Sequence, residues 1–175
     1  MSKVLHTEHL TLRPCTLADL DALHELWTDP DIRRFLFDDR TLSRQEASDF
    51  LAASTESFAQ QGYGLWLFFE RLGDASGGPS TIAGFSGLMP VPEEPPSLVF
   101  GTHPQRWGRG YAKEATAAVL RYVFDELGLE QVLADVDEPN TASIHVLAGL
   151  GMVLTGRAVV NDHPLLYYAI HRPSP

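Results

Sequence analysis

The chain has 175 residues, of which 44% are hydrophobic and 21% are charged, which is enough for a single globular domain with a sizeable core. Its formal net charge of −10 argues against general nucleic-acid binding, which needs a basic surface, and suits solubility or a cationic substrate. A single cysteine, Cys15, excludes an internal disulfide, and no stretch is apolar enough for a signal region or membrane span, so we expect a cytoplasmic protein.

The first part of the chain predicts one strand followed by helical segments. Leu10–Arg13 alternates apolar and polar residues, as a half-buried strand does, and Pro14 closes it. Capping and breaking residues then mark the ends of three helical segments. These are Leu17–Trp27 after an N-cap at Thr16, a short turn at Ile32–Phe37 before the Asp38-Asp39 loop, and a helix from the Ser43–Glu46 capping box to Gln61.

The rest of the chain predicts strands with two further helices. The expected strands are Leu65–Arg71, Thr81–Leu88, Ser97–Thr102, Gln131–Val136, Val153–Val160 and Leu165–His171. The expected helices are Ala112–Leu127 and Thr141–Leu150, and the expected loops include a hairpin-type loop at Gly73–Ser80 and a proline-rich loop at Pro90–Pro96. The order βααβββαβαββ, without linker or repeat, predicts one mixed α/β domain over residues 1–175.

One stretch, Ser97–Leu127, predicts an anion-binding turn. A short strand is followed by a glycine-rich turn, Gln105–Ala112, and then by a helix. Amides at the start of a helix have no intrahelical partner, and the helix dipole adds partial positive charge there. Gly108 and Gly110 lack a Cβ, so an anion can approach the backbone closely. The cationic side chains of this turn are Arg106 and Arg109. We therefore predict a pyrophosphate site here.

Four stretches together carry a resemblance to a known family. They are Thr7–Leu36, Ile82–Phe85 (IAGF), His103–Glu114 (HPQRWGRGYAKE), and Asn140–Ser143 through Gly151-Met152, where Met152 replaces the usual Phe. A lone Gly-x-Gly is a weak signal, but four stretches in order across nearly the whole chain are specific. They resemble the GNAT superfamily of acyl-CoA-dependent N-acyltransferases, and within it the ribosomal-protein N-terminal acetyltransferase (RimJ/RimL-type) branch. The resemblance implies a central twisted mixed seven-stranded sheet flanked by about four helices.

The resemblance also implies a reaction. Acetyl-CoA would serve as co-substrate, without a metal, and a primary amine would attack it directly in a ternary complex. The expected acceptor is a small-molecule amine or a protein N-terminus; no nucleic acid or membrane is expected, and a homodimer is left open. The alternative is a non-catalytic acyl-CoA-binding sensor or regulatory module, because the positions of the family's usual catalytic Tyr and Glu are not filled by those residues.

The resemblance assigns a set of residues to coenzyme A. The family's loop pattern fits in two registers, one from Gln105 and one from Trp107; we prefer the second, which puts Ala112 at the head of the helix. In either register the expected cofactor-binding residues are Arg106, Trp107, Gly108, Arg109, Gly110, Tyr111 and Ala112. Asn140 is implied to bond the pantetheine arm or the acceptor, and it also suits a helix N-cap; the two roles are compatible.

Ser143 is the one catalytic candidate that the resemblance supplies. The family's usual acid, a tyrosine, corresponds to Leu147, which cannot donate a proton, and Ser143 shares its helix face. The implied role is a hydrogen bond to the thioester sulfur, so that Ser143 also contacts the cofactor; the other reading is a serine that satisfies the helix backbone. The general base is left open among His103, Asp135, Asp137, Glu138, Tyr167 and Tyr168. Cys15 is expected in the core.

Overall fold

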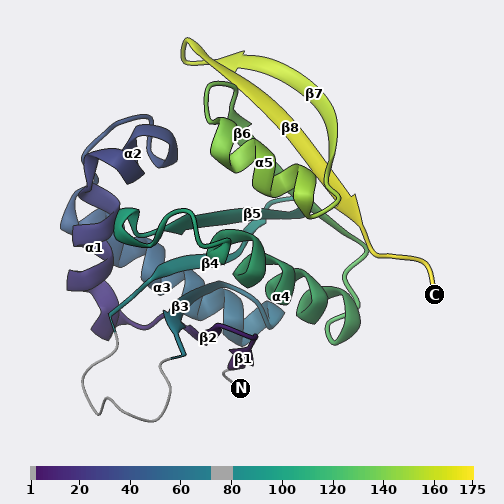
Figure 1. Ribbon diagram of the computed structural model, residues 1–175, viewed down its shortest axis with the longest axis horizontal. Helices are drawn as coiled ribbons and strands as arrows, with labels where there is room; N and C mark the ends of the chain where they lie inside the picture. Colours follow the sequence, from purple (N-terminus) through teal and green to yellow (C-terminus); the bar gives the residue numbers. More distant parts are fainter. Residues whose placement is uncertain (1–2, 72–80) are drawn as a thin grey trace.

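The computed structural model describes residues 3–71 and 81–175, so the loop expected at Gly73–Ser80 lies outside the described residues. In the described part, one eight-stranded sheet has the order β1-β2-β3-β4-β5-β6-β8-β7 (Figure 1). The strands are β1 Leu5–His6, β2 Leu10–Pro14, β3 Leu65–Glu70, β4 Gly84–Val91, β5 Glu94–Thr102, β6 Gln131–Asp137, β7 Val153–Val160 and β8 His163–His171. Neighbouring strands are antiparallel, except that β5 and β6 run parallel.

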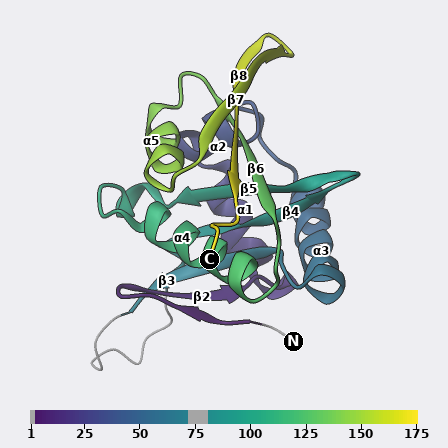
Figure 2. The same cartoon turned by 90° about the vertical axis from the view of Figure 1, so that its right-hand side faces the viewer.

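Helices cover both faces of the sheet, and Figure 2 shows α3 on one side and α4 with α5 on the other. The helices are α1 Leu20–Thr28, α2 Pro30–Leu36, α3 Arg44–Gln61, α4 Tyr111–Asp125 and α5 Thr141–Gly149, with short 3₁₀ turns η1 Leu17–Asp19 and η2 Pro104–Arg106. Within the described residues, no helix combines the length and the apolar character that crossing a bilayer requires.

Two hydrophobic clusters follow from the alternation of side chains along the strands. On β3, Trp66 and Phe68 pack with α4, whereas Leu65 and Leu67 pack with α1 and α3. All four side chains are fully buried. A continuous apolar run such as LWLFFE is expected for a central strand that is covered on both faces, and the structure confirms it.

The mixed α/β class and the central mixed sheet are confirmed, but the element count differs from the expectation. The described residues form eight strands and five α-helices instead of seven strands and about four helices. The additional strand, β1, has only two residues and pairs Leu5 with Leu12, so it carries no periodicity that a sequence could show. The turn expected at Ile32–Phe37 is a helix, α2, which starts at Pro30 with Asp29 as its N-cap.

The proline-rich loop expected at Pro90–Pro96 is wrong. The strands β4 and β5 continue through it as a hairpin in which Val91 pairs with Glu94, and Glu93 in the turn has a φ of 62°. The pairing of β3 with β4 ends at Gly87, and β6 reaches β5 only at Ser97, so the hairpin tip has no second neighbour. Proline has no N–H to donate, but no second strand lies beside the hairpin tip to accept one. The prolines are therefore tolerated there.

The arrangement of β5 and β6 positions the site. These parallel strands are paired at Ser97 and Leu133, and no further pair joins them in the described residues. Beyond this point β5 continues to Thr102 and β6 to Asp137, and the two strands diverge. The sheet therefore opens in its middle, and the chain segments that follow the two strands, before α4 and α5, flank the opening.

Candidate active site

A cleft of about 700 Å³ occupies this opening in the sheet. Its walls come from the C-terminal part of β5, the turn before α4, the end of β6 and the first turns of α5, with α2 on the far side. The predicted cofactor-binding residues that line it are Arg106, Trp107, Gly108, Gly110, Tyr111, Ala112, Asn140 and Ser143, whereas Arg109 does not line it. The structure thus brings both halves of the predicted coenzyme A site to one cleft.

The glycine turn has the backbone that its sequence requires. Gly108 and Gly110 have φ values of 79° and 76°, in the left-handed region where a Cβ is costly. A Cβ at either position would meet no protein atom within 4 Å, so the space beside both glycines is free. Gly110 is the N-cap of α4, and Tyr111 is its first residue, one position before the expected Ala112. The amides of this first turn are thus free for an anion.

Glu70 at the end of β3 holds the side chains of this turn. Its carboxylate accepts hydrogen bonds from Arg106 Nε at 3.0 Å, from Arg109 at 2.6 Å and from the Tyr111 hydroxyl at 2.9 Å. Partial burial alone would raise the pKa of Glu70, but the hydrogen bonds from Tyr111 and Arg106 and the nearby guanidinium charges lower it. Both arginines expected near the pyrophosphate are therefore paired within the protein.

On the opposite wall, Asn140 and Ser143 form a pair at the start of α5. Asn140 is the N-cap, and its Oδ1 accepts from the Ser143 amide at 3.2 Å. Its Nδ2 donates to Ser143 Oγ at 3.0 Å. Because Ser143 Oγ accepts this bond, its own proton remains available for a third group. Asn140 thus serves as the helix cap, and the role of Ser143 toward the thioester sulfur stays a prediction.

The structure separates the six base candidates. His103 Nδ1 accepts from the Gln105 amide at 3.2 Å, Glu138 pairs with Arg157 at 3.3 Å, and Tyr168 is buried in the core. Asp135 alone among the six lines the cleft in the described residues. Its Cα partner on β8 is Tyr167, so these two side chains emerge on one face of the sheet. Asp137 and Tyr167 therefore neighbour the cleft residue Asp135 without lining the cleft.

Asp135 and Asp137 lie on the face of β6 opposite to α4. The alternating residues Val132, Ala134 and Val136 pack into the cluster that includes α4, so the two carboxylates project to the other side. The Asp135 side chain is open to the cleft. Desolvation by the surrounding protein nevertheless raises its pKa, and the charge of Asp38 adds to this effect.

Sequence reasoning missed several residues of the site. Glu70 was part of an apolar strand without a motif, and its role depends on pairing across the sheet. Lys113 lines the cleft three residues after Gly110, in the first turn of α4, and its position in a basic glycine-rich turn was a usable signal. Asp31 and Phe35 reach the cleft from α2, and only tertiary structure places that helix opposite β6.

The remaining candidates are structural. Cys15 is 2% exposed, donates to Ser54 Oγ at 3.4 Å, and burial raises its pKa to about 11. A thiol with such a pKa is a poor nucleophile at neutral pH. Among the aromatic residues of the central strands, Trp66 and Phe68 are core residues, whereas Phe85 and Phe100 line the cleft.

The fold and this cleft are those of a GNAT-type domain, and the comparison with known families agrees. The Acetyltransferase (GNAT) domain matches residues 9–153. The chain belongs to this family and carries an N-acetyltransferase domain.

Individual relatives give further points of comparison. The chain is 32% identical over 160 residues to the FsC-acetyl coenzyme A-N(2)-transacetylase of Aspergillus fumigatus, covering 85% of this chain and 64% of that protein's length. The RimL ribosomal L7/L12 alpha-N-protein acetyltransferase in complex with coenzyme A has the same fold (TM-score 0.79, 17% identity, 97% and 98% of the two chains). So does the spermidine N-acetyltransferase of Vibrio cholerae in complex with CoA and spermine (TM-score 0.76, 18% identity, 95% and 97%).

Proposed function

We propose that this protein transfers the acetyl group of acetyl-CoA to a primary amine by direct attack in a ternary complex. The observation that carries the proposal is the meeting of two features in one cleft between β5 and β6. One is the free N-terminus of α4 behind two left-handed glycines, and the other is the Ser143 hydroxyl, whose proton is unclaimed within the described residues. The first suits a pyrophosphate and the second a leaving thiolate.

The cofactor would lie along the wall formed by α4 and α5. Of the predicted amides of Trp107–Ala112, that of Trp107 already donates to the Pro104 carbonyl at 3.3 Å, so those of Gly108–Ala112 would hold the pyrophosphate. Lys113 and the paired Arg106 and Arg109 would supply positive charge around it. The pantetheine arm would enter between the diverging strands and reach Asn140. Beyond Ser97, amides of β5 that face β6 have no strand partner in the described residues, so one of them can stabilise the oxyanion.

The chemistry would use two side chains on opposite sides of the thioester. Asp135 takes the proton of the acceptor ammonium, and the free amine forms a bond to the thioester carbon. The tetrahedral intermediate then collapses, the carbon–sulfur bond breaks, and Ser143 donates a hydrogen bond to the departing sulfur, which takes up the second proton of the attacking nitrogen to leave as the CoA thiol. The protein contributes positioning, oxyanion stabilisation and proton transfer, and no covalent enzyme intermediate is needed.

The acceptor would be a protein N-terminus or a small amine, since relatives of similar fold act on a ribosomal protein or on spermidine according to their names. Membership of the RimJ/RimL-type branch is part of the proposal; it is supported by the four matching stretches and by the RimL-like fold. A single domain over residues 1–175 and the cytoplasmic location stay predictions, and the homodimer remains open.

The deciding experiment measures release of CoA from acetyl-CoA with a panel of amines that includes peptides with free N-termini. Turnover above background with at least one amine is expected. Tight acetyl-CoA binding without turnover on any acceptor would instead identify a non-catalytic sensor module. Weak or absent acetyl-CoA binding would contradict both the acetyltransferase and the sensor function.

A further inference from the structure

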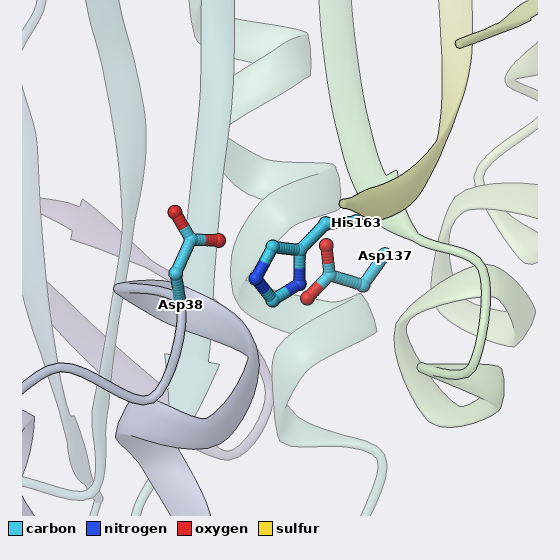
Figure 3. Close-up of side chains that lie close together, drawn as sticks. All are labelled: Asp38, Asp137 and His163. Carbon is cyan, nitrogen blue, oxygen red and sulfur yellow. The ribbon is translucent and has the colours of Figure 1, made fainter. Parts of the chain in front are cut away.

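Three titratable side chains from distant parts of the chain meet beside the cleft, on its α2 side. Asp38 belongs to the loop after α2, Asp137 ends β6, and His163 begins β8. One ligand atom from each residue lies within 4.8 Å of the other two. Figure 3 shows the His163 ring between the two carboxylates. We call these three residues the acidic triangle.

The acidic triangle is next to the proposed reaction centre. Asp135, which lines the cleft, and Asp137 are two residues apart on β6, so their side chains share one face. A strand advances about 3.3 Å per residue, which separates the two positions by about 6–7 Å. His163 and Tyr167 project from β8 to the same side, because Asp135 pairs with Tyr167 and Asp137 with Leu165.

Asp137 is buried without a partner. Its exposed fraction is 7%, yet in residues 3–71 and 81–175 no hydrogen bond or ion pair reaches its carboxylate. Desolvation raises the pKa of Asp137, the proximity of His163 lowers it, and the charges of Asp38 and Asp135 raise it further. A further cation would stabilise a largely buried carboxylate that has like charges around it. This arrangement therefore suits a positively charged ligand.

The spacing of the acidic triangle distinguishes two kinds of cation. No ion pair within 4.0 Å joins His163 to Asp38 or Asp137, so these nitrogen–oxygen separations lie between 4.0 and 4.8 Å. Ligands about 2.1 Å from a tetrahedral metal would lie about 3.4 Å apart. Acceptors that surround an ammonium nitrogen at about 2.8 Å lie about 4.6 Å apart. The observed spacing fits the ammonium group.

We propose that the acidic triangle binds a second ammonium group of the acceptor, so that the acceptor is a dication of the diamine class. This inference rests on the proposed function. The reacting nitrogen would lie beside Asp135, and the distal ammonium would donate to the carboxylates of Asp38 and Asp137 and to an unprotonated ring nitrogen of His163. The separation along β6 favours amines with a few bonds between the two nitrogens.

The test compares matched acceptors. Diaminobutane and butylamine are assayed with saturating acetyl-CoA, together with a series from diaminoethane to diaminohexane. We expect a KM for diaminobutane at least about tenfold below that of butylamine, because the second ammonium makes charge-assisted hydrogen bonds. Equal KM values for the two amines would overturn the proposal.

Substitutions separate the acidic triangle from the reaction centre. Asp137→Asn and Asp38→Asn should raise the KM for diaminobutane about tenfold while leaving the KM values of butylamine and acetyl-CoA unchanged. Asp162→Asn is the matched control for Asp38→Asn, because both residues have positive φ values of 64° and 53°, which Asn tolerates. Unchanged diamine kinetics in both triangle variants, with thermal melts that show a folded protein, would contradict the assignment.

Two binding measurements keep the outcomes distinct. If no amine supports turnover, the proposed function fails, and calorimetry with diaminobutane still tests the site: binding that Asp137→Asn weakens supports it, and no binding overturns it. Titration with Zn²⁺ and Mn²⁺ tests the other cation. Metal binding that Asp137→Asn abolishes, without any heat from diaminobutane, would identify a metal site and overturn the ammonium assignment.

Discussion

Arg109 donates a hydrogen bond to Glu70 at 2.6 Å, so the cation nearest to the left-handed glycines is already paired with a carboxylate of β3. The same carboxylate accepts from Arg106 at 3.0 Å. Two functions are open to such a pair: Glu70 can order the turn for the cofactor, or it can compete with the pyrophosphate for the arginines. Three donors on one carboxylate that is 19% exposed favour ordering.

Replacing Glu70 with Ala should therefore weaken acetyl-CoA binding roughly three- to tenfold, since half-exposed ion pairs contribute about 1 kcal/mol or less each. Calorimetric titration with CoA measures the change. The control is Glu130→Ala, which removes the same charge and an exposed pair with Arg172 outside the cleft. Tighter CoA binding in the Glu70 variant would show competition instead of ordering.

Replacing Gly110 and Gly151 with Ala separates the cost of backbone strain from the loss of room for the ligand. Gly110 and Gly151 have φ values of 76° and 86°, and at both a Cβ would meet no protein atom within 4 Å. Ala at either position should cost about 1–2 kcal/mol of stability because the left-handed conformation disfavours a Cβ.

Only the Gly110→Ala variant should also lose CoA affinity, by about tenfold or more, because Gly151 is not part of the cleft wall. Thermal melts and CoA titrations of both variants give the two quantities. Equal CoA affinity in the two variants would remove the pyrophosphate assignment for this turn.

The local features of this site could be predicted from the sequence, whereas contacts between distant segments could not. Three features depend only on residues that are close in sequence, and the structure contains each of them: the glycine turn, the Asn140 cap and the capping box at Ser43. The role of Glu70 depends on the turn that lies beside the end of β3, and the acidic triangle depends on the placement of α2. The hairpin through Pro90 can form because the neighbouring strands β3 and β6 do not extend along it. No local sequence pattern predicts where those neighbouring strands end.

Ser143→Ala tests the proton donor. We expect kcat to fall by about tenfold to a hundredfold while the dissociation constant of acetyl-CoA changes less than threefold, because the hydroxyl stabilises a charge that develops on sulfur. Asn140 keeps its bond to the residue-143 amide, so the melting temperature should remain nearly constant. Ser143→Thr retains a hydroxyl and should recover part of the rate. An unchanged kcat in the alanine variant would show that Ser143 has only a structural role.

Asp135→Asn separates activity from stability. The pKa of Asp135 is raised by desolvation, and by the charge of Asp38, above its unfolded value. The protonated carboxyl is therefore favoured by folding, and this contribution to stability is complete below the unfolded pKa and is lost as the pH rises through the folded pKa. At neutral pH the ionised Asp135 destabilises the fold, so the Asn variant should melt at the same temperature as the parent or higher. In acid, where Asp135 is protonated, the difference should disappear.

The same variant should lose catalysis. A general base typically contributes about a hundredfold or more, so we expect kcat to fall by at least that factor at neutral pH. In the parent, the rate should decline on the acidic side at a pH above the ordinary aspartate pKa, and Asp135→Asn should lack this decline. Glu138→Gln, which changes a carboxylate paired with Arg157, is the control and should retain the parent profile. A stable Asp135→Asn variant with parental kcat and pH profile would show that water or another group takes the proton.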